Sequence, residues 1–109
     1  MPTKKFRKWR VGELNSRVID ILNLLFIVGT SIYIGEENIK SIKKKHPKDY
    51  EKYGKEIKNI IANPTYLAKH PKKNSIEYIK VFKEGEDFVL VAVRASGSGI
   101  MFVRSIFIM

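Results

Sequence analysis

The stretches that decide the fold are residues 75–82 (SIEYIKVF), 88–94 (FVLVAVR) and 100–108 (IMFVRSIFI). All three are rich in Ile, Val and Phe, which pack well on the pleated surface of a β-sheet. The segments between them, residues 84–87 (EGED) and 96–99 (SGSG), are short and consist of turn-forming residues. Because linkers this short join antiparallel neighbours, the pattern predicts a meander of three strands. The middle stretch is apolar up to its arginine, as in a strand covered on both faces.

The residues before this meander favour helices. From Leu14 onward, apolar residues recur at helical spacing up to Leu25, and Asn15 or Ser16 could cap the start. Residues 36–45 begin with two glutamates and end with three lysines, which suits the helix dipole at both ends. Residues 47–62 begin with a proline and carry tyrosines and isoleucines on one helical face. Between these helices, the β-branched residues 30–34 predict a strand or an extended connector.

We therefore expect an α+β fold in which N-terminal helices pack on one face of an antiparallel sheet of three to four strands. The chain has 109 residues, of which 44% are hydrophobic, enough for one core but not for two. Residues 1–11 lack apolar periodicity and combine several lysines and arginines with no acidic residue. We expect residues 1–11 to form a flexible basic arm and residues 12–109 to form a single domain.

The charge balance indicates a polyanionic partner. Lys and Arg number 21 against 11 Asp and Glu, which gives a formal net charge of +10. Such a charge attracts nucleic acid or anionic lipid, although solvated lysines that only raise solubility are an alternative. The most apolar stretch, residues 18–34, is interrupted by Asp20 and Asn23, and its unbroken part is shorter than the roughly 20 residues of a spanning helix. We therefore expect RNA and not a membrane as the partner.

The chain contains no cysteine, which excludes disulfides, thiolate nucleophiles and zinc–thiolate sites. It also contains no glycine-rich phosphate loop and no carboxylate cluster for a divalent ion. We therefore expect neither a metal nor another cofactor, and the cytoplasm is the expected location.

One of the two histidines is a candidate for proton transfer. RNA cleavage without a metal requires a base, an acid and cations that stabilise the charged phosphate. His46 follows Ile39 and Ile42 at helical spacing, so we expect its ring to face the sheet. Histidine can serve as a base near neutral pH. The alternative is a helix-terminal histidine that bonds the last carbonyls of its helix.

Two arginines are candidates for binding the phosphate. Arg94 and Arg104 interrupt otherwise apolar strands, where a guanidinium is costly unless it is paired or faces a groove. They form a phosphate clamp if the hairpin register places them on one face, which strand parity alone does not decide. Glu77 is their expected ion-pair partner. A catalytic group and a purely structural network of these three residues both fit the sequence.

The expected nucleic-acid-binding residues are mostly lysines around the two histidines, with one tyrosine placed between prolines where it could stack on a base. They are Lys43, Lys44, Lys45, Lys48, Tyr66, Lys69, His70, Lys72 and Lys73.

A series of short motifs resembles a known group of nucleases. The motifs are VGEL at 11–14, IYI at 32–34, KHPKDY at 45–50, IIANPTY at 60–66, SIEY at 75–78, VAVR at 91–94 and VRS at 103–105. In this order they resemble the phage and mobile-element domains grouped with barnase, EndoU, colicin-type and RelE-like nucleases. The resemblance implies helices packed on an antiparallel sheet and metal-independent ribonuclease activity. It places His46, Asn63, Pro64, Tyr66, Ser75, Glu77, Arg94 and Arg104 at motif positions of the group.

Two positions depart from that pattern. Ser41 stands where the group has a second histidine, and Thr65 stands where it has an aspartate. Our leading hypothesis is a phage or mobile-element ribonuclease that acts on cellular RNA as a toxin or effector, with a possible antitoxin or host protein complex as partner. The alternative is a catalytically degenerate protein that binds nucleic acid, or inhibits, through the same basic surface.

Overall fold

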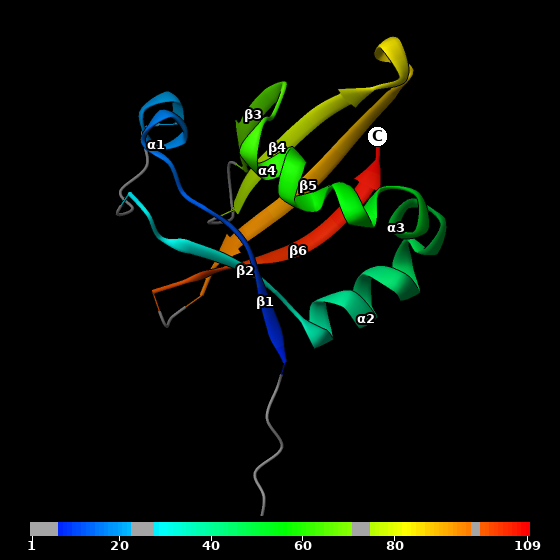
Figure 1. The fold of residues 1–109 in the computed structure, drawn as a ribbon, viewed down its shortest axis with the longest axis horizontal. Coiled ribbons are helices and arrows are strands. Elements are labelled where there is room, and N and C mark those ends of the chain that lie inside the picture. The colour runs from blue at the N-terminus through cyan, green and yellow to red at the C-terminus, as the bar shows by residue number, and fades with distance from the viewer. Residues whose placement is uncertain (1–6, 23–27, 71–74, 97–98) are drawn as a thin grey trace, which may run out of the picture.

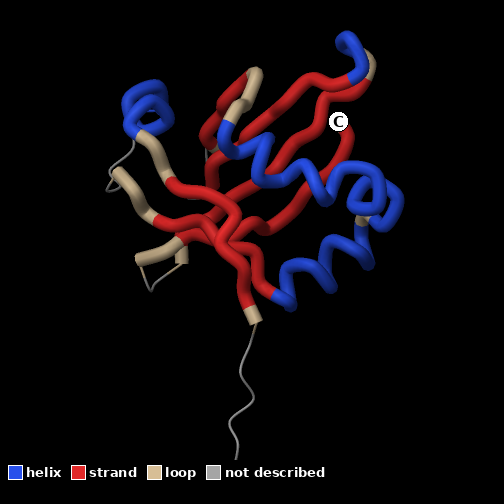
Figure 2. The backbone as a smooth tube through the Cα atoms, viewed as in Figure 1, coloured by secondary structure: helices blue, strands red, loops and turns tan. Residues whose placement is uncertain are grey.

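The computed structural model describes residues 7–22, 28–70, 75–96 and 99–109. Helices pack on a six-stranded sheet whose strand order is β1-β2-β6-β5-β4-β3 (Figures 1 and 2). The strands are β1 (Lys8–Glu13), β2 (Ser31–Gly35), β3 (Tyr66–Lys69), β4 (Ser75–Phe82), β5 (Asp87–Ala95) and β6 (Met101–Ile108). The α-helices are α1 (Ser16–Leu22), α2 (Glu36–Lys45), α3 (Pro47–Tyr53) and α4 (Ile57–Ala62). The α+β class is as expected.

The meander predicted from the last third of the chain is present. β4, β5 and β6 are consecutive antiparallel neighbours, and β5 lies between the other two. Val89, Val91 and Val93 of β5 are fully buried on the face that belongs to the hydrophobic core. Leu90, on the opposite face, is also buried, whereas Phe88 at the start of the strand is 38% exposed. Burial on both faces is therefore confirmed for residues 89–91, whereas Ala92 on the second face is only half-buried.

The sheet is larger than the predicted three to four strands and is mixed, not purely antiparallel. β2 pairs with β6 in parallel, at Ile32 with Met101 and at Tyr33 with Phe102. β1 adds an antiparallel strand at one edge, and β3 adds another at the opposite edge. The parallel pair joins residues far apart in sequence, and β3 (YLAK) has no β-branched residue to indicate a strand. Neither feature has a local sequence pattern.

The N-terminal segment also differs from the expectation. Residues 8–11, which we expected to belong to a flexible arm, form most of β1, and Val11 is buried in the core. Pairing with β2 satisfies the backbone of this segment even though its exposed side chains are mainly basic. Residues 1–6 lie outside the described residues.

The helices follow the sequence pattern with one break. The Asn15 side chain accepts a hydrogen bond from the Val18 backbone N–H at 2.9 Å, which caps α1 as expected. The continuation of that helix toward Leu25 lies outside the described residues. The single helix expected over residues 47–62 is divided into α3, a 3₁₀ turn (Gly54–Glu56) and α4. The break lets α3 lie beside β6 while α4 crosses the sheet and packs on β1, β4 and β5 (Figure 1).

The core lies between α4 and the sheet. Ile57, Ile60 and Ile61 of α4 are buried in one cluster with the valines of β5. Tyr78 of β4 is fully buried in the same cluster, and burial raises its pKa to about 12. Its side chain is therefore inaccessible for stacking on a base. No helix within the described ranges has the length and apolar character needed to cross a membrane.

Candidate active site

A β-bulge in β6 places both strand arginines on the same face of the sheet. Ala92 of β5 is opposite Ser105, but the next residue, Val93, is opposite Val103, so Arg104 is the extra residue on β6. In a bulge of this kind, two successive side chains can point to one side of the sheet. Arg104 and Ser105 accordingly line the same pocket as Ala92 and Arg94. The register that the sequence left open therefore places Arg94 and Arg104 on the same face of the sheet.

The pocket has a volume of about 570 Å³ and lies between α2 and the face of the sheet formed by β4, β5 and β6. Its lining is polar and combines cations, carboxylates, hydroxyls and an imidazole. The lining residues are Glu37, Asn38, Ser41, Ile42, Lys45, His70, Ser75, Glu77, Ala92, Arg94, Arg104 and Ser105. Three of the four residues expected to be catalytic, Glu77, Arg94 and Arg104, therefore meet in one cavity.

The cations of the pocket lack carboxylate partners. Arg94 is half-buried, and its Nε atom is buried and has no hydrogen-bond partner among the described residues. Within the described part of the chain, no ion pair joins Arg94, Arg104 or Lys45 to any carboxylate. The expected ion pair between Glu77 and the arginines is therefore not formed. Because a buried donor without a partner is costly, the guanidinium of Arg94 is suited to an anion that enters from solvent.

Two groups able to transfer protons share the pocket with the arginines. Glu77 of β4 is half-buried and stands opposite Ala92 of β5 and Ala68 of β3. His70 follows directly after β3, and its backbone N–H donates to the Ser75 carbonyl at 2.9 Å. This bond holds the histidine at the end of the β3–β4 hairpin. A carboxylate and an imidazole can act as base and acid on the same substrate.

His46 lies in a different place. It connects α2 to α3, where its backbone N–H donates to the Ile42 carbonyl at 2.7 Å. Its ring stacks on Phe107 of β6, with centroids 5.1 Å apart and planes inclined by 26°. The ring thus faces the sheet, as the helical spacing indicated, but His46 is not among the residues that line the pocket.

The expected nucleic-acid-binding residues are spread over several surfaces. Lys45 and His70 line the pocket, whereas Lys43 lies over the Tyr50 ring at 5.6 Å. Tyr66 is 55% exposed, and its ring lies nearly parallel to that of Phe88, with centroids 6.4 Å apart. The remaining described members are exposed lysines, Lys44, Lys48 and Lys69. Lys72 and Lys73 lie outside the described residues.

The two departures from the nuclease pattern differ in position. Ser41 lines the pocket, so the histidine of the pattern would stand at the site itself. Thr65 lies elsewhere, immediately before β3, and its hydroxyl accepts a hydrogen bond from the Val81 backbone N–H at 3.1 Å. The Thr65 backbone N–H donates to the Ile79 carbonyl at 2.8 Å, so this residue anchors β3 to β4. Its contacts are structural, and they do not involve the pocket.

Sequence reasoning missed most of the α2 wall of the pocket. Glu37, Ser41 and Lys45 recur every four residues, so they share one helical face that turns toward the sheet. The signal was present as polar residues at a spacing of four, next to Ile42, which also lines the pocket. Ser105 was missed as a pocket residue because its orientation depends on the bulge.

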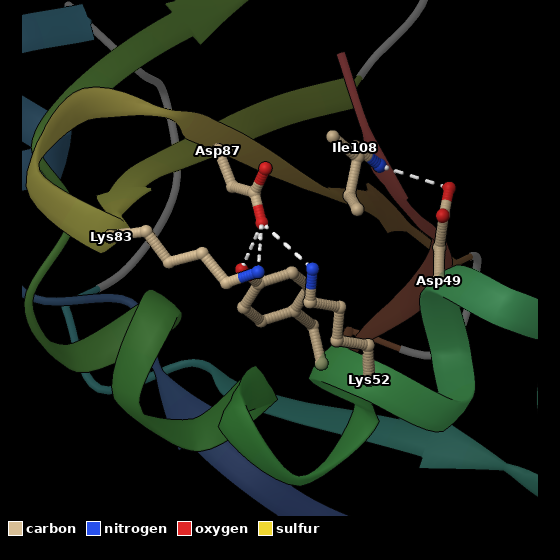
Figure 3. A network of polar contacts seen from close by, with 6 residues as sticks. Asp49, Lys52, Lys83, Asp87 and Ile108 are labelled. Carbon is tan, nitrogen blue, oxygen red and sulfur yellow. Dashed lines mark hydrogen bonds and ion pairs between the residues drawn. The ribbon is translucent and has the colours of Figure 1, made fainter.

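A second polar cluster lies at the opposite end of β5 and is internally satisfied (Figure 3). Asp87 Oδ2 accepts hydrogen bonds from the Tyr53 hydroxyl and from Lys52 Nζ, the latter at 3.2 Å, and Lys83 Nζ lies 3.6 Å away. The hydrogen bonds from Tyr53 and then Lys52 lower the pKa of Asp87. Nearby, Asp49 Oδ2 accepts the Ile108 backbone N–H at 3.0 Å. These contacts attach α3 to β5 and β6.

Comparison with known proteins identifies the family. A family model described as PBECR3, phage-Barnase-EndoU-ColicinE5/D-RelE like nuclease3, matches residues 8–109. Neither the curated proteins nor the solved structures include a match to the chain. Within the described residues, no group of three or more His, Cys, Asp and Glu side chains could hold a metal ion. The match begins at β1 and extends through β6, so it covers every strand and helix on which the pocket is built. The chain therefore belongs to the phage Barnase–EndoU–colicin E5/D–RelE-like nuclease family PBECR3.

Proposed function

We propose that the chain is a metal-independent endoribonuclease and that the pocket between α2 and the sheet is its active site. The observation that carries this proposal is the buried Nε of Arg94, which has no hydrogen-bond partner within the residues that the structure describes. Arg94 lines the same cavity as Glu77 and Arg104. A phosphodiester entering the pocket supplies the acceptor that this guanidinium lacks. Membership of a nuclease family makes nucleic acid the substrate class.

The proposed reaction uses the substrate's own 2′-hydroxyl as nucleophile. Glu77 takes the proton of that hydroxyl while its oxygen attacks the adjacent phosphorus, and the bond from phosphorus to the 5′-oxygen breaks. His70 donates a proton to the departing 5′-oxygen. Arg94, Arg104 and Lys45 stabilise the negative charge that develops on the pentacoordinate phosphate. The products are a 2′,3′-cyclic phosphate and a 5′-hydroxyl end.

His46 has a smaller role in this proposal than its motif position suggested. Its stacking on Phe107 and its backbone bond at the end of α2 support a structural function. We assign proton transfer to Glu77 and His70 because both line the cavity that contains the arginines. Substitution of His46 separates the two assignments and is described below.

A non-catalytic function is the second candidate, and Ser41 is the observation that favours it. Ser41 lines the pocket at the position where the nuclease pattern has a histidine. A serine cannot take the role of an imidazole in proton transfer at neutral pH. In this case the same cations bind RNA or a host nucleic-acid complex without cutting it. The proposed biological setting, a phage or mobile-element effector in a host cytoplasm with an antitoxin or host protein as partner, is compatible with both functions.

Incubation of the pure protein with total RNA and with transfer RNA in EDTA tests the proposal. We expect RNA fragments with 2′,3′-cyclic phosphate and 5′-hydroxyl ends, and no cleavage of DNA of the same sequence, which has no 2′-hydroxyl. RNA that binds but stays intact at high protein concentration would establish the binding function. Cleavage that requires an added divalent ion, or that gives 5′-phosphate ends, would contradict the proposed chemistry.

A further inference from the structure

A second pocket adjoins the proposed active site. Its volume is about 380 Å³, and it shares Glu37, Asn38 and Arg104 with the first pocket. The rest of its lining comes from the start of β1, the β2–α2 junction and β6, and consists of Arg7, Lys8, Gly35, Glu36 and Phe102. Because Arg104 lines both cavities, a ligand group bound by Arg104 lies at the boundary between them.

The second pocket contains an aromatic ring beside the phosphate clamp. Phe102 of β6 is directly opposite Arg94 of β5. Side chains at opposite positions of an antiparallel pair lie on one face, with Cβ atoms roughly 4.5–5.5 Å apart. Phe102 is half-buried, and its ring contacts that of Tyr33 at a centroid distance of 6.3 Å. The ring also lines the pocket, so it offers a surface on which a planar group can stack.

The polar wall of this pocket suits a nucleoside better than a second phosphate. Glu36 and Glu37 contribute carboxylates, which repel an anion but accept hydrogen bonds from sugar hydroxyls and from base N–H groups. Asn38 Oδ1 accepts the Gly35 backbone N–H at 2.8 Å, a bond that does not engage the Asn38 amide N–H donors. Arg7 and Lys8 keep the edge of the pocket cationic.

We propose that this second pocket binds the nucleoside next to the cleaved phosphate of a single-stranded RNA, with its base stacked on Phe102 and its phosphate shared with Arg104. The inference rests on the proposed function, because that function places the phosphate at Arg94 and Arg104. An unpaired base is required, since a base within a duplex is already stacked on its neighbours. The minimal ligand that fills both pockets is a dinucleotide.

A binding experiment with short ligands that cannot be cleaved tests the subsite. The probes are a dinucleoside monophosphate with a 2′-O-methyl group at the cleavage position and two versions of it that each lack one of the two bases. Stacking of one base on an aromatic side chain should make the complete dinucleotide bind roughly 10-fold more tightly than the version that lacks the base placed on Phe102. Phe102→Leu should remove this advantage and leave the affinity of that version unchanged, whereas Phe102→Tyr should retain the advantage.

Phe88→Leu is the matched control. Phe88 is another partly exposed phenylalanine on the sheet, six residues from Arg94 along β5, or about 20 Å at the usual rise per residue. It lies beyond the reach of a dinucleotide, so its substitution should not affect the dinucleotide advantage. Melting curves of each variant establish that the fold is intact, and Phe102→Tyr provides the test if Phe102→Leu does not fold.

The outcomes distinguish the subsite from the active site. If Phe102→Leu binds the dinucleotide as well as the wild-type protein does while Arg94→Gln does not, the subsite is overturned and the clamp stands. If neither the dinucleotide nor its versions that lack one base bind, both proposals are overturned. If the dinucleotide advantage depends on Phe102 but no RNA is cleaved, the subsite stands and the nuclease proposal does not.

Discussion

Strand β5 carries a carboxylate at its start and a guanidinium near its end, and the two charges differ in their internal partners. At its start, Asp87 accepts hydrogen bonds from Tyr53 and Lys52 and lies near Lys83. Near its end, about 23 Å away at the usual rise per residue, Arg94 has a buried Nε without a hydrogen-bond partner in the described part of the chain. The same strand thus carries one charge that internal partners neutralise and one that we propose binds the phosphate of a ligand.

Because of this difference, we expect Asp87 to contribute to the stability of the fold and Arg94 to the proposed chemistry. A charge with several internal partners contributes to stability, and its removal leaves those partners unsatisfied. A cation without a counter-charge makes no such contribution, and it destabilises the folded state by the cost of its burial. We therefore expect substitutions at the two ends of β5 to have opposite consequences for stability and for chemistry.

The largest effect is expected for Arg94→Gln. Loss of one preorganised donor to a developing oxyanion lowers the cleavage rate by about 10²- to 10³-fold. The melting temperature should not fall, because no internal ion pair is lost. Asp87→Asn is the matched control at the other end of β5 and should show the reverse, an unchanged rate with a lower melting temperature. An Arg94→Gln protein that cleaves RNA at the wild-type rate would remove Arg94 from the site.

Glu77→Gln and His70→Asn should each lower the cleavage rate by roughly 10²- to 10⁴-fold, as expected for a base and an acid, with RNA affinity nearly unchanged.

His46→Ala should leave the cleavage rate intact and lower the free energy of unfolding by about 1 kcal/mol, through loss of its stacking on Phe107. Rates and melting curves measured together separate these roles. A stable His46→Ala protein that does not cleave RNA would show that His46 takes part in proton transfer.

Ser41→His tests whether the pocket lacks a catalytic group. An imidazole at this position, within the cavity, should raise the cleavage rate by up to about 10²-fold if proton transfer limits it. Ser105→His introduces the same group on the sheet side of the pocket and serves as the control. An equal gain from both variants would indicate a general effect of added imidazole, and no gain from either would indicate that the wild-type pair is sufficient.

The salt dependence of RNA binding measures how many lysine and arginine side chains contact phosphates. With about five contacts to a single strand, the slope of log affinity against log salt should be about −3.5. Joint replacement of Lys43, Lys44 and Lys45 by alanine should make that slope shallower by up to about 2, since each contact contributes about 0.7. Lys58→Ala, an exposed lysine on α4, is the control. A flat slope for the wild-type protein would show that its charge serves solubility.

The smallest effect is the pH dependence of the Asp87 cluster. The pKa of Asp87 in the folded protein lies below its ordinary value of 3.8, so the cluster stabilises the fold above that value. The contribution is lost as the pH falls through the lowered pKa. Wild-type and Asp87→Asn proteins should therefore differ in melting temperature at pH 7 and converge in strong acid. A difference that persists unchanged at low pH would mean that the cluster acts through packing and not through charge.

The parts of the fold with a local pattern could be predicted from the sequence, and the parts that depend on distant partners could not. The alternation and turns of β4, β5 and β6 lie within one stretch, as do the charged ends of α2. β3 has no β-branched residue to indicate a strand, and it forms by pairing with β4. Within the site, Arg94 and Glu77 follow from strand parity, whereas the orientation of Arg104 depends on a bulge that has no sequence signature. His46 and His70 have similar lysine- and proline-rich surroundings, so the sequence could not tell which of them borders the pocket.

The parallel pairing of β2 with β6 also affects the order in which the chain can fold. β6 follows the other five described strands along the chain, yet it lies between β2 and β5 in the sheet. The β1–β2 pair joins the rest of the sheet only through the pairing of β2 with β6, in which Ile32 is opposite Met101. Contacts between such distant residues form slowly because a long loop has to close. The pocket takes one wall from α2 and another from β6, so a growing chain cannot complete it before the last strand has been synthesised. Any activity of this pocket is therefore delayed until translation has passed β6.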